Sequence, residues 1–199
     1  MNRKYNESFK DLYHGTIESR AAQIVRTQTF IPSKRGWCGS GVYFYDNKSK
    51  AWWSAQRTSV DERKKGNLGD KPDIVIADIK SISRTAILDL RAPDDLKSFA
   101  DYVNKFLSDQ DFDIVDGLED KNDSDEEIIL KREILLSFYC EENGIQLIIG
   151  YFKQREQEKI DIEKCFADTW QLVIGIETIY CAKDPGIVHN IRRRGELYG

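Results

Sequence analysis

The chain has 199 residues, of which 40% are hydrophobic and 32% are charged. This composition is typical of one soluble globular domain and excludes a multidomain assembly, a collagen-like repeat and a globally disordered chain. The net charge of -4 at pH 7 argues against a generally basic surface that would bind nucleic acid. We therefore expect a single domain over residues 1–199.

The cysteines and the N-terminus both indicate a cytoplasmic protein. The N-terminal residues 1–8 are polar and lack the apolar stretch of a signal peptide, and no later run is long enough to cross a bilayer. We expect no membrane partner. The cysteines never fall in the close pairs of zinc or redox sites, so we expect reduced, mostly buried thiols and no metal: Cys38, Cys140, Cys165 and Cys181.

Apolar periodicity predicts several short elements in the first part of the chain. Thr16 is expected to cap the first helix. In chain order the predictions are a strand at 11–14, a helix at 17–26, a turn-rich segment at 32–40, a strand at 41–45, a helix at 49–57 and a polar loop at 61–71.

The second part of the chain has stronger periodicity. It predicts strands at 73–79 and 86–90, a helix at 94–107, a helix at 126–142, a strand at 145–152, a helix at 154–165 and a last strand at 176–182. Strands and helices do not alternate regularly, which favours an α+β domain over a parallel doubly wound sheet. The acidic segment 109–127 lacks the order of a calcium-binding EF-hand loop, so we interpret it as a solvated loop.

Two short motifs carry the chemistry. Residues 12–16 read Leu-Tyr-His-Gly-Thr, and residues 39–44 read Gly-Ser-Gly-Val-Tyr-Phe. The first sets the imidazole of His14 beside a glycine, where a ligand can approach the backbone closely. The second sets the ring of Tyr43 on a strand entered through glycines, where it could stack on a flat heterocycle. Together they indicate a slot for a nucleotide base.

The same two motifs, followed by Ser-Lys-Ala at 49–51, resemble the signature of the ADP-ribosyltransferases. The branch is the one shared by poly(ADP-ribose) polymerases and diphtheria-toxin-like enzymes, including small bacterial toxin and phage-defence effectors. The resemblance covers residues 12–53 in order. It implies a split β-sheet core with flanking helices and transfer of ADP-ribose from NAD, which is a substrate here, to a macromolecule, with release of nicotinamide.

The resemblance also assigns roles to individual residues. His14 would hydrogen-bond a ribose of NAD, Gly15 would receive the nicotinamide carboxamide through its backbone, and Thr16 completes that motif. Tyr43 would stack on the nicotinamide ring, with Trp53 or Trp52 as a second wall, although core packing also suits a tryptophan. Candidate cations for the pyrophosphate are Arg20, Lys34 and Arg35, which could equally be solvated surface charges.

Glu177 is the candidate catalytic carboxylate. Cleavage of the nicotinamide bond builds positive charge on the ribose, and a carboxylate near the 2-position hydroxyl stabilises that transition state. In the family the glutamate lies at the start of the last strand, where Glu177 falls. Matching the strand by Asp184 instead puts Ile179 at that place, with Glu177 two residues earlier on the same face. The resemblance then implies mono-ADP-ribosylation or an inactive protein, and the missing Glu-x-Glu pattern disfavours an arginine acceptor.

The acceptor and partners stay open. Residues 192–194 are three arginines that could hold an RNA or DNA acceptor or could form a charged tail. A protein acceptor and an antitoxin partner also fit the resemblance. Three further interpretations remain: an NAD glycohydrolase, an RNA 2'-phosphotransferase, and a catalytically inactive module that binds NAD or a partner.

Overall fold

The computed structural model describes residues 5–109, 125–153 and 176–193. The expected helix at 154–165, Cys165, Arg194 and most of the acidic segment 109–127 lie outside these ranges.

The described strands form one seven-stranded sheet in the order β4-β5-β6-β2-β1-β3-β7. Neighbouring strands run antiparallel except for the β4–β5 pair, which is parallel. The strands are β1 (Asn6–Ile17), β2 (Val42–Tyr45), β3 (Pro72–Ser83), β4 (Ile87–Asp89), β5 (Leu147–Lys153), β6 (Ile176–Ala182) and β7 (Val188–Arg193). A mainly antiparallel sheet with helices confirms the expected mixture of α and β structure.

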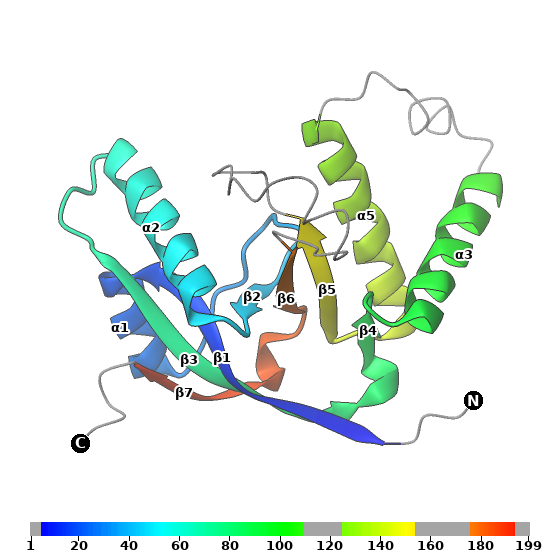
Figure 1. The fold of residues 1–199 in the computed structure, drawn as a ribbon, viewed down its shortest axis with the longest axis horizontal. Coiled ribbons are helices and arrows are strands. Elements are labelled where there is room, and N and C mark those ends of the chain that lie inside the picture. The colour runs from blue at the N-terminus through cyan, green and yellow to red at the C-terminus, as the bar shows by residue number, and fades with distance from the viewer. Residues whose placement is uncertain (1–4, 110–124, 154–175, 194–199) are drawn as a thin grey trace, which may run out of the picture.

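Four α-helices cover this sheet in the described part of the chain. They are α1 (Glu18–Thr27), α2 (Lys48–Lys64), α3 (Pro93–Asp109) and α5 (Asp125–Asn143). Short 3-10 turns at Arg84–Ala86 and Pro185–Ile187 connect strands. Figure 1 shows α3 and α5 side by side at the β4–β5 end of the sheet and α2 toward the other end.

Three expectations about the elements are wrong. Thr16 does not cap α1, because it is buried within β1 and the residue before the helix, Ile17, makes no side-chain cap bond. Helix α2 continues through Lys64, so it takes in the first part of the loop expected at 61–71. The strand at 176–182 is not the last one, because β7 follows it and pairs with β3.

The two halves of the sheet meet at a narrow seam between β1 and β2. These strands share a single register pair, Tyr13 with Tyr45, whereas β1 pairs with β3 along most of its length. Helices α1 and α2 lie on opposite faces of the β1–β3 half: Ala21 of α1 packs in the cluster of Val75 and Ala77, and Ala51 of α2 packs on Ile74 and Ile76. The seam is therefore flanked by a helix on each face.

Candidate functional site

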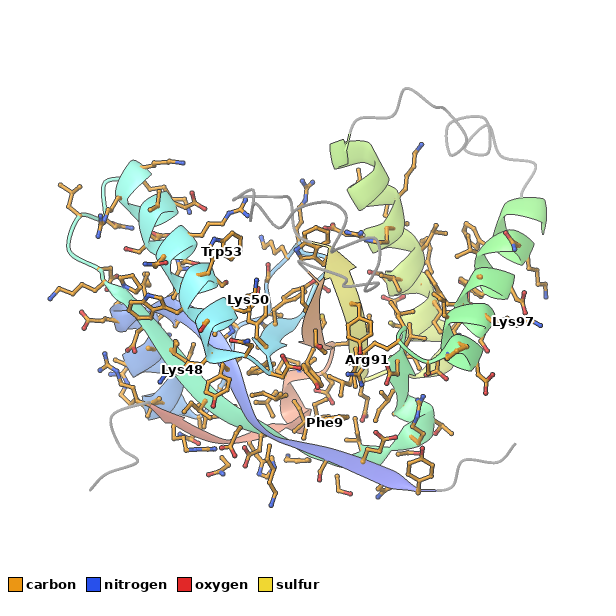
Figure 2. The ribbon with its side chains drawn as sticks, viewed as in Figure 1. Phe9, Lys48, Lys50, Trp53, Arg91 and Lys97 are labelled. Carbon is orange, nitrogen blue, oxygen red and sulfur yellow. The ribbon has the colours of Figure 1, made fainter. Side chains whose placement is uncertain are left out.

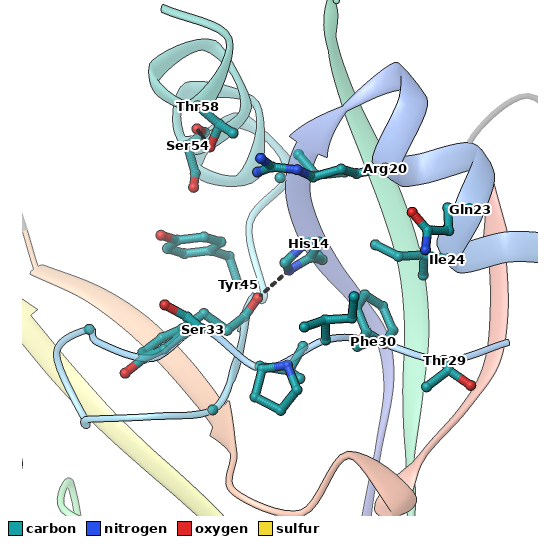
Figure 3. A pocket seen from close by; sticks show the side chains of 18 of the residues that line it. His14, Arg20, Gln23, Ile24, Thr29, Phe30, Ser33, Tyr45, Ser54 and Thr58 are labelled. Atoms are coloured by element: carbon teal, nitrogen blue, oxygen red, sulfur yellow. Dashed lines mark hydrogen bonds between the residues drawn. The ribbon is translucent and has the colours of Figure 1, made fainter. Parts of the chain in front are cut away.

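A cavity of about 790 Å³ lies at the seam. Its walls come from the end of β1, from α1, from the loop between α1 and β2, from β2 and from one side of α2. Figure 3 shows these elements converging around His14. A volume in the range of about 300–1,000 Å³ is usual for a small-molecule site. The cavity therefore has the size for a nucleotide-containing ligand.

His14 bridges the two strands at the point where their backbone pairing ends. Its Nδ1 lies 2.8 Å from the carbonyl oxygen of Tyr43, and because a carbonyl only accepts, this nitrogen carries the proton. The imidazole packs against Phe30 and Phe44, with ring centroids 5.1 Å and 5.8 Å away. Burial lowers the pKa of His14. The hydrogen bond to the Tyr43 carbonyl raises this pKa and the charge of Arg20 lowers it, but burial is the largest effect. His14 is thus a neutral imidazole with an acceptor lone pair on Nε2.

Tyr43 presents its ring to the cavity while its hydroxyl is occupied elsewhere. The hydroxyl oxygen accepts from the backbone N–H of Cys38 at 3.0 Å and donates to the carbonyl of Gly39. Burial and the neighbouring Cys181 and Cys38 thiols raise the pKa of this hydroxyl, so it stays protonated at neutral pH. The hydroxyl thus both accepts from and donates to the backbone of the loop. We therefore expect the Tyr43 side chain to act by stacking of its ring and not by proton transfer.

Gly15 and Gly36 are glycines for steric reasons. A Cβ on Gly15 would lie 1.9 Å from the carbonyl oxygen of Ala51, so only glycine lets β1 approach the backbone of α2 this closely. A Cβ on Gly36 would lie 2.5 Å from the ring of Tyr43. A larger residue at either position would push apart two elements that form the cavity walls.

Two arginines border the cavity. Arg20 extends from α1 toward Ser54 and Thr58 of α2, as Figure 3 shows, and donates to Glu62 at 2.8 Å. Hydrogen bonds from Asn67, Lys65 and Arg20 lower the pKa of Glu62 to about 2, so this carboxylate is charged at neutral pH. The second cation, Arg35, is exposed on the loop before β2. Both are placed to meet an anionic group in the cavity.

The carboxylate proposed from sequence lies on the neighbouring strand. The backbone of Glu177 is part of β6 and is in register with Phe152 of β5, while its side chain lies outside the described residues. Ile179 pairs with Tyr45 and is 2% exposed in the core. Ile179 therefore supplies packing and no functional group at this place.

The structure brings most of the sequence candidates together. His14, Gly15, Thr16, Arg35 and Tyr43 all line the cavity. Among the other candidates, Trp53 and Lys34 do not: Trp53 packs under Arg57, with the guanidinium carbon 5.7 Å from the ring centroid, and Lys34 lines a neighbouring groove beside α5.

Sequence reasoning missed several lining residues. The aromatic walls beside Tyr43 are Tyr45 and Trp37, and α2 contributes Ser54 and Thr58. The period of two along a strand already puts residues 43 and 45 on one face, so Tyr45 could have been found. Trp37 lies in a loop whose path carries no comparable signal.

The arginines near the C-terminus are held in ion pairs. Arg192 pairs with Asp11 and lies 3.4 Å from Asp78, and Arg193 lies 2.6 Å from Asp73 and 3.8 Å from Glu18. Their charges are largely neutralised by these carboxylates. They hold β7 onto β1, β3 and the start of α1 instead of forming an open basic surface.

Family models, curated proteins and solved structures offer no match to this chain. Within residues 5–109, 125–153 and 176–193, no group of three or more histidines, cysteines or carboxylates could hold a metal ion. None of the helices in these same ranges is long and apolar enough to cross a membrane.

Proposed function

We propose that the chain is an NAD-dependent mono-ADP-ribosyltransferase that uses the cavity at the seam and acts on a macromolecule. One observation carries the proposal. His14 and Tyr43, from the two separate sequence motifs, line one cavity and are joined by the bond between Nδ1 and the Tyr43 carbonyl. This arrangement supports the split-sheet fold and the nucleotide site that the resemblance implies.

The proposed reaction cleaves the glycosidic bond between the nicotinamide nitrogen and the ribose C1'. Nicotinamide leaves with the bonding electron pair, the acceptor nucleophile forms the new bond to C1', and the proton of the acceptor passes to water. Positive charge develops on the ribose during this exchange, so a nearby carboxylate lowers the barrier. We assign this role to Glu177 on β6, the strand next to Tyr43.

The cavity residues have complementary roles in this proposal. The Tyr43 ring stacks on nicotinamide, and Nε2 of His14 accepts a hydrogen bond from a ribose hydroxyl, which requires the neutral imidazole. Arg20 and Arg35 meet the pyrophosphate, and Glu62 holds the guanidinium of Arg20 in place.

The deciding experiment measures free nicotinamide after incubation with NAD, with and without bacterial protein or total RNA as acceptor. We expect release that depends on an acceptor and is lost in His14→Ala and Glu177→Gln. His189→Ala is the matched control, because His189 is exposed on β7 and does not line the cavity. Loss of toxicity in His14→Ala on induced bacterial expression would support the toxin or anti-phage role.

Other outcomes assign the cavity differently. Equal release with and without acceptor would indicate an NAD glycohydrolase. NAD binding without release under any condition would overturn the transferase and leave a binding module.

A further inference from the structure

Helix α2 concentrates positive charge beside the cavity. Residues 48–65 contain six basic and two acidic residues, although the whole chain has a net charge of -4. Of the two carboxylates, Glu62 is buried and bonded to Arg20, and Asp61 lies 3.5 Å from Lys64. Basic residues therefore outnumber carboxylates by four, six against two, on one helix of an otherwise acidic protein.

Aromatic rings lie among these charges. Trp52 is 39% exposed, and Trp53 is half-buried beneath the guanidinium of Arg57 at 5.7 Å. Figure 2 shows Lys48, Lys50 and Trp53 along α2. Residues spaced by three or four positions share a helix face, so Lys50, Trp53 and Arg57 form one stripe, named here the α2 stripe.

The α2 stripe runs along the edge of the cavity. Ser54 and Thr58 line the cavity from α2. Lys50 precedes Ser54 by four positions and Arg57 follows it by three, so both lie on the helix surface between Ser54 and Trp53. A strand bound along the stripe would lie beside the part of the cavity wall that Ser54 and Thr58 form.

We propose that the α2 stripe is a docking surface for single-stranded nucleic acid. A base stacks against the pair formed by the Trp53 ring and the Arg57 guanidinium that lies over it, and the charges of Arg57 and Lys50 attract the backbone phosphates beside that base. Stacking platforms interleaved with cations are how proteins bind single strands with little sequence preference. The arginines 192 and 193 cannot serve this purpose, since they are held in ion pairs with Asp11, Asp73 and Glu18.

This inference names the acceptor class of the proposed transferase and rests on that function only for the transfer step. A base or a hydroxyl of a strand on the α2 stripe would be the nucleophile presented to the ribose C1'. Binding of the strand itself requires neither NAD nor catalysis, so the two proposals can fail separately.

The test is fluorescence anisotropy of the full chain, without NAD, with labelled oligothymidylate and oligouridylate of about 20 nucleotides in about 100 mM salt. We expect Trp53→Ala to weaken binding about tenfold and Trp53→Phe to retain most of it. Arg57→Gln, at an exposed position, should lower the slope of log affinity against log salt by about one. Lys97→Gln, the matched charge loss on α3 (Figure 2), should change neither.

Each result decides a separate point. No binding of either oligonucleotide, or an equal loss in Lys97→Gln, would overturn the docking surface, and transfer to protein alone would overturn the nucleic-acid acceptor. Tighter binding of oligothymidylate would identify DNA as the partner, and tighter binding of oligouridylate would identify RNA. Either result would support the docking surface. Binding that depends on Trp53 without nicotinamide release would leave the surface standing and overturn the transferase.

Discussion

At the scale of single residues, Gly15 sets the distance between β1 and α2. A Cβ at this position would lie 1.9 Å from the Ala51 carbonyl and 2.8 Å from the Ala55 nitrogen, and both are backbone atoms of a helix that cannot move separately. We expect Gly15→Ala to lower the free energy of unfolding by about 2–3 kcal/mol through overpacking.

Urea denaturation measures this effect against a matched substitution. Within the described part of the chain, no atom would lie within 4 Å of a Cβ on Gly69, and its φ is not positive, so Gly69→Ala should change the free energy of unfolding by less than about 1 kcal/mol. Equal effects of the two substitutions would contradict the close approach of β1 and α2.

The second residue-scale prediction concerns the pH dependence of stability. Burial lowers the pKa of His14 below its usual value of 6.5, so the unfolded chain binds a proton more readily than the folded one. The contribution of neutral His14 to the free energy of unfolding is fully present above pH 6.5. It falls as the pH is lowered below that value, by at most about 1.4 kcal/mol per pH unit for one proton.

Urea denaturation between about pH 7.5 and 5.5 tests this sign. The fall should disappear in His14→Gln and persist in His189→Gln, which removes the only other histidine. A fall of the same size in both variants would assign the pH dependence to other groups.

The sequence predicted some residues of the site but not the contact that joins them. His14, Gly15 and Tyr43 were found because each belongs to a contiguous motif, and the structure places all three at one cavity. The partner of the imidazole could not be found in this way. It is a backbone carbonyl 29 positions away, and backbone groups are identical at every residue, so the sequence carries no mark of which one is used.

At the scale of elements, β7 depends on one buried carboxylate. Asp78 of β3 is 6% exposed and accepts hydrogen bonds from Asn190 at 2.7 Å and from the N–H of Asp11 at 2.9 Å. Burial alone would raise the pKa of Asp78, but these bonds and the charge of Arg192 lower it. Removing the carboxylate takes the acceptor from the Asn190 amide and from the N–H of Asp11, and leaves Arg192 with Asp11 as its carboxylate partner.

We expect Asp78→Ala to lower the free energy of unfolding by about 3 kcal/mol, since a buried charged partner is lost. Asp101→Ala, at an exposed position on α3, is the matched control and should cost under about 0.5 kcal/mol. Urea unfolding at neutral pH compares them. A loss below about 1 kcal/mol in Asp78→Ala would show that β7 is held by other contacts.

Helices α3 and α5, which have strong apolar periodicity, were predicted within two residues of their observed bounds, and β3 was found but continues to Ser83, beyond its expected end at residue 79. Strand β7 was missed because its sequence, Val-His-Asn-Ile-Arg-Arg, is mostly polar. Its polar side chains are used in pairing with Asp11, Asp73 and Asp78, which are distant in the chain. Such tertiary pairing leaves no periodicity to detect.

At the scale of the whole molecule, the sheet is continuous but unevenly joined. The halves β4-β5-β6-β2 and β1-β3-β7 meet through the Tyr13–Tyr45 pair, the His14 bond and the shared apolar cluster. We expect amide hydrogen exchange to show separate protection classes for the two halves, with the lowest protection at the β1–β2 junction. Mass spectrometry of exchanged fragments measures this, and one common opening step for both halves would contradict it.

The narrow seam has a consequence for ligand affinity. A small rotation of one half of the sheet against the other would widen or narrow the cavity while breaking few backbone hydrogen bonds. The angle between the halves is therefore the variable that sets the width of the binding slot. A molecule that touches both walls has to fix this angle, and its measured affinity includes the entropy lost in doing so.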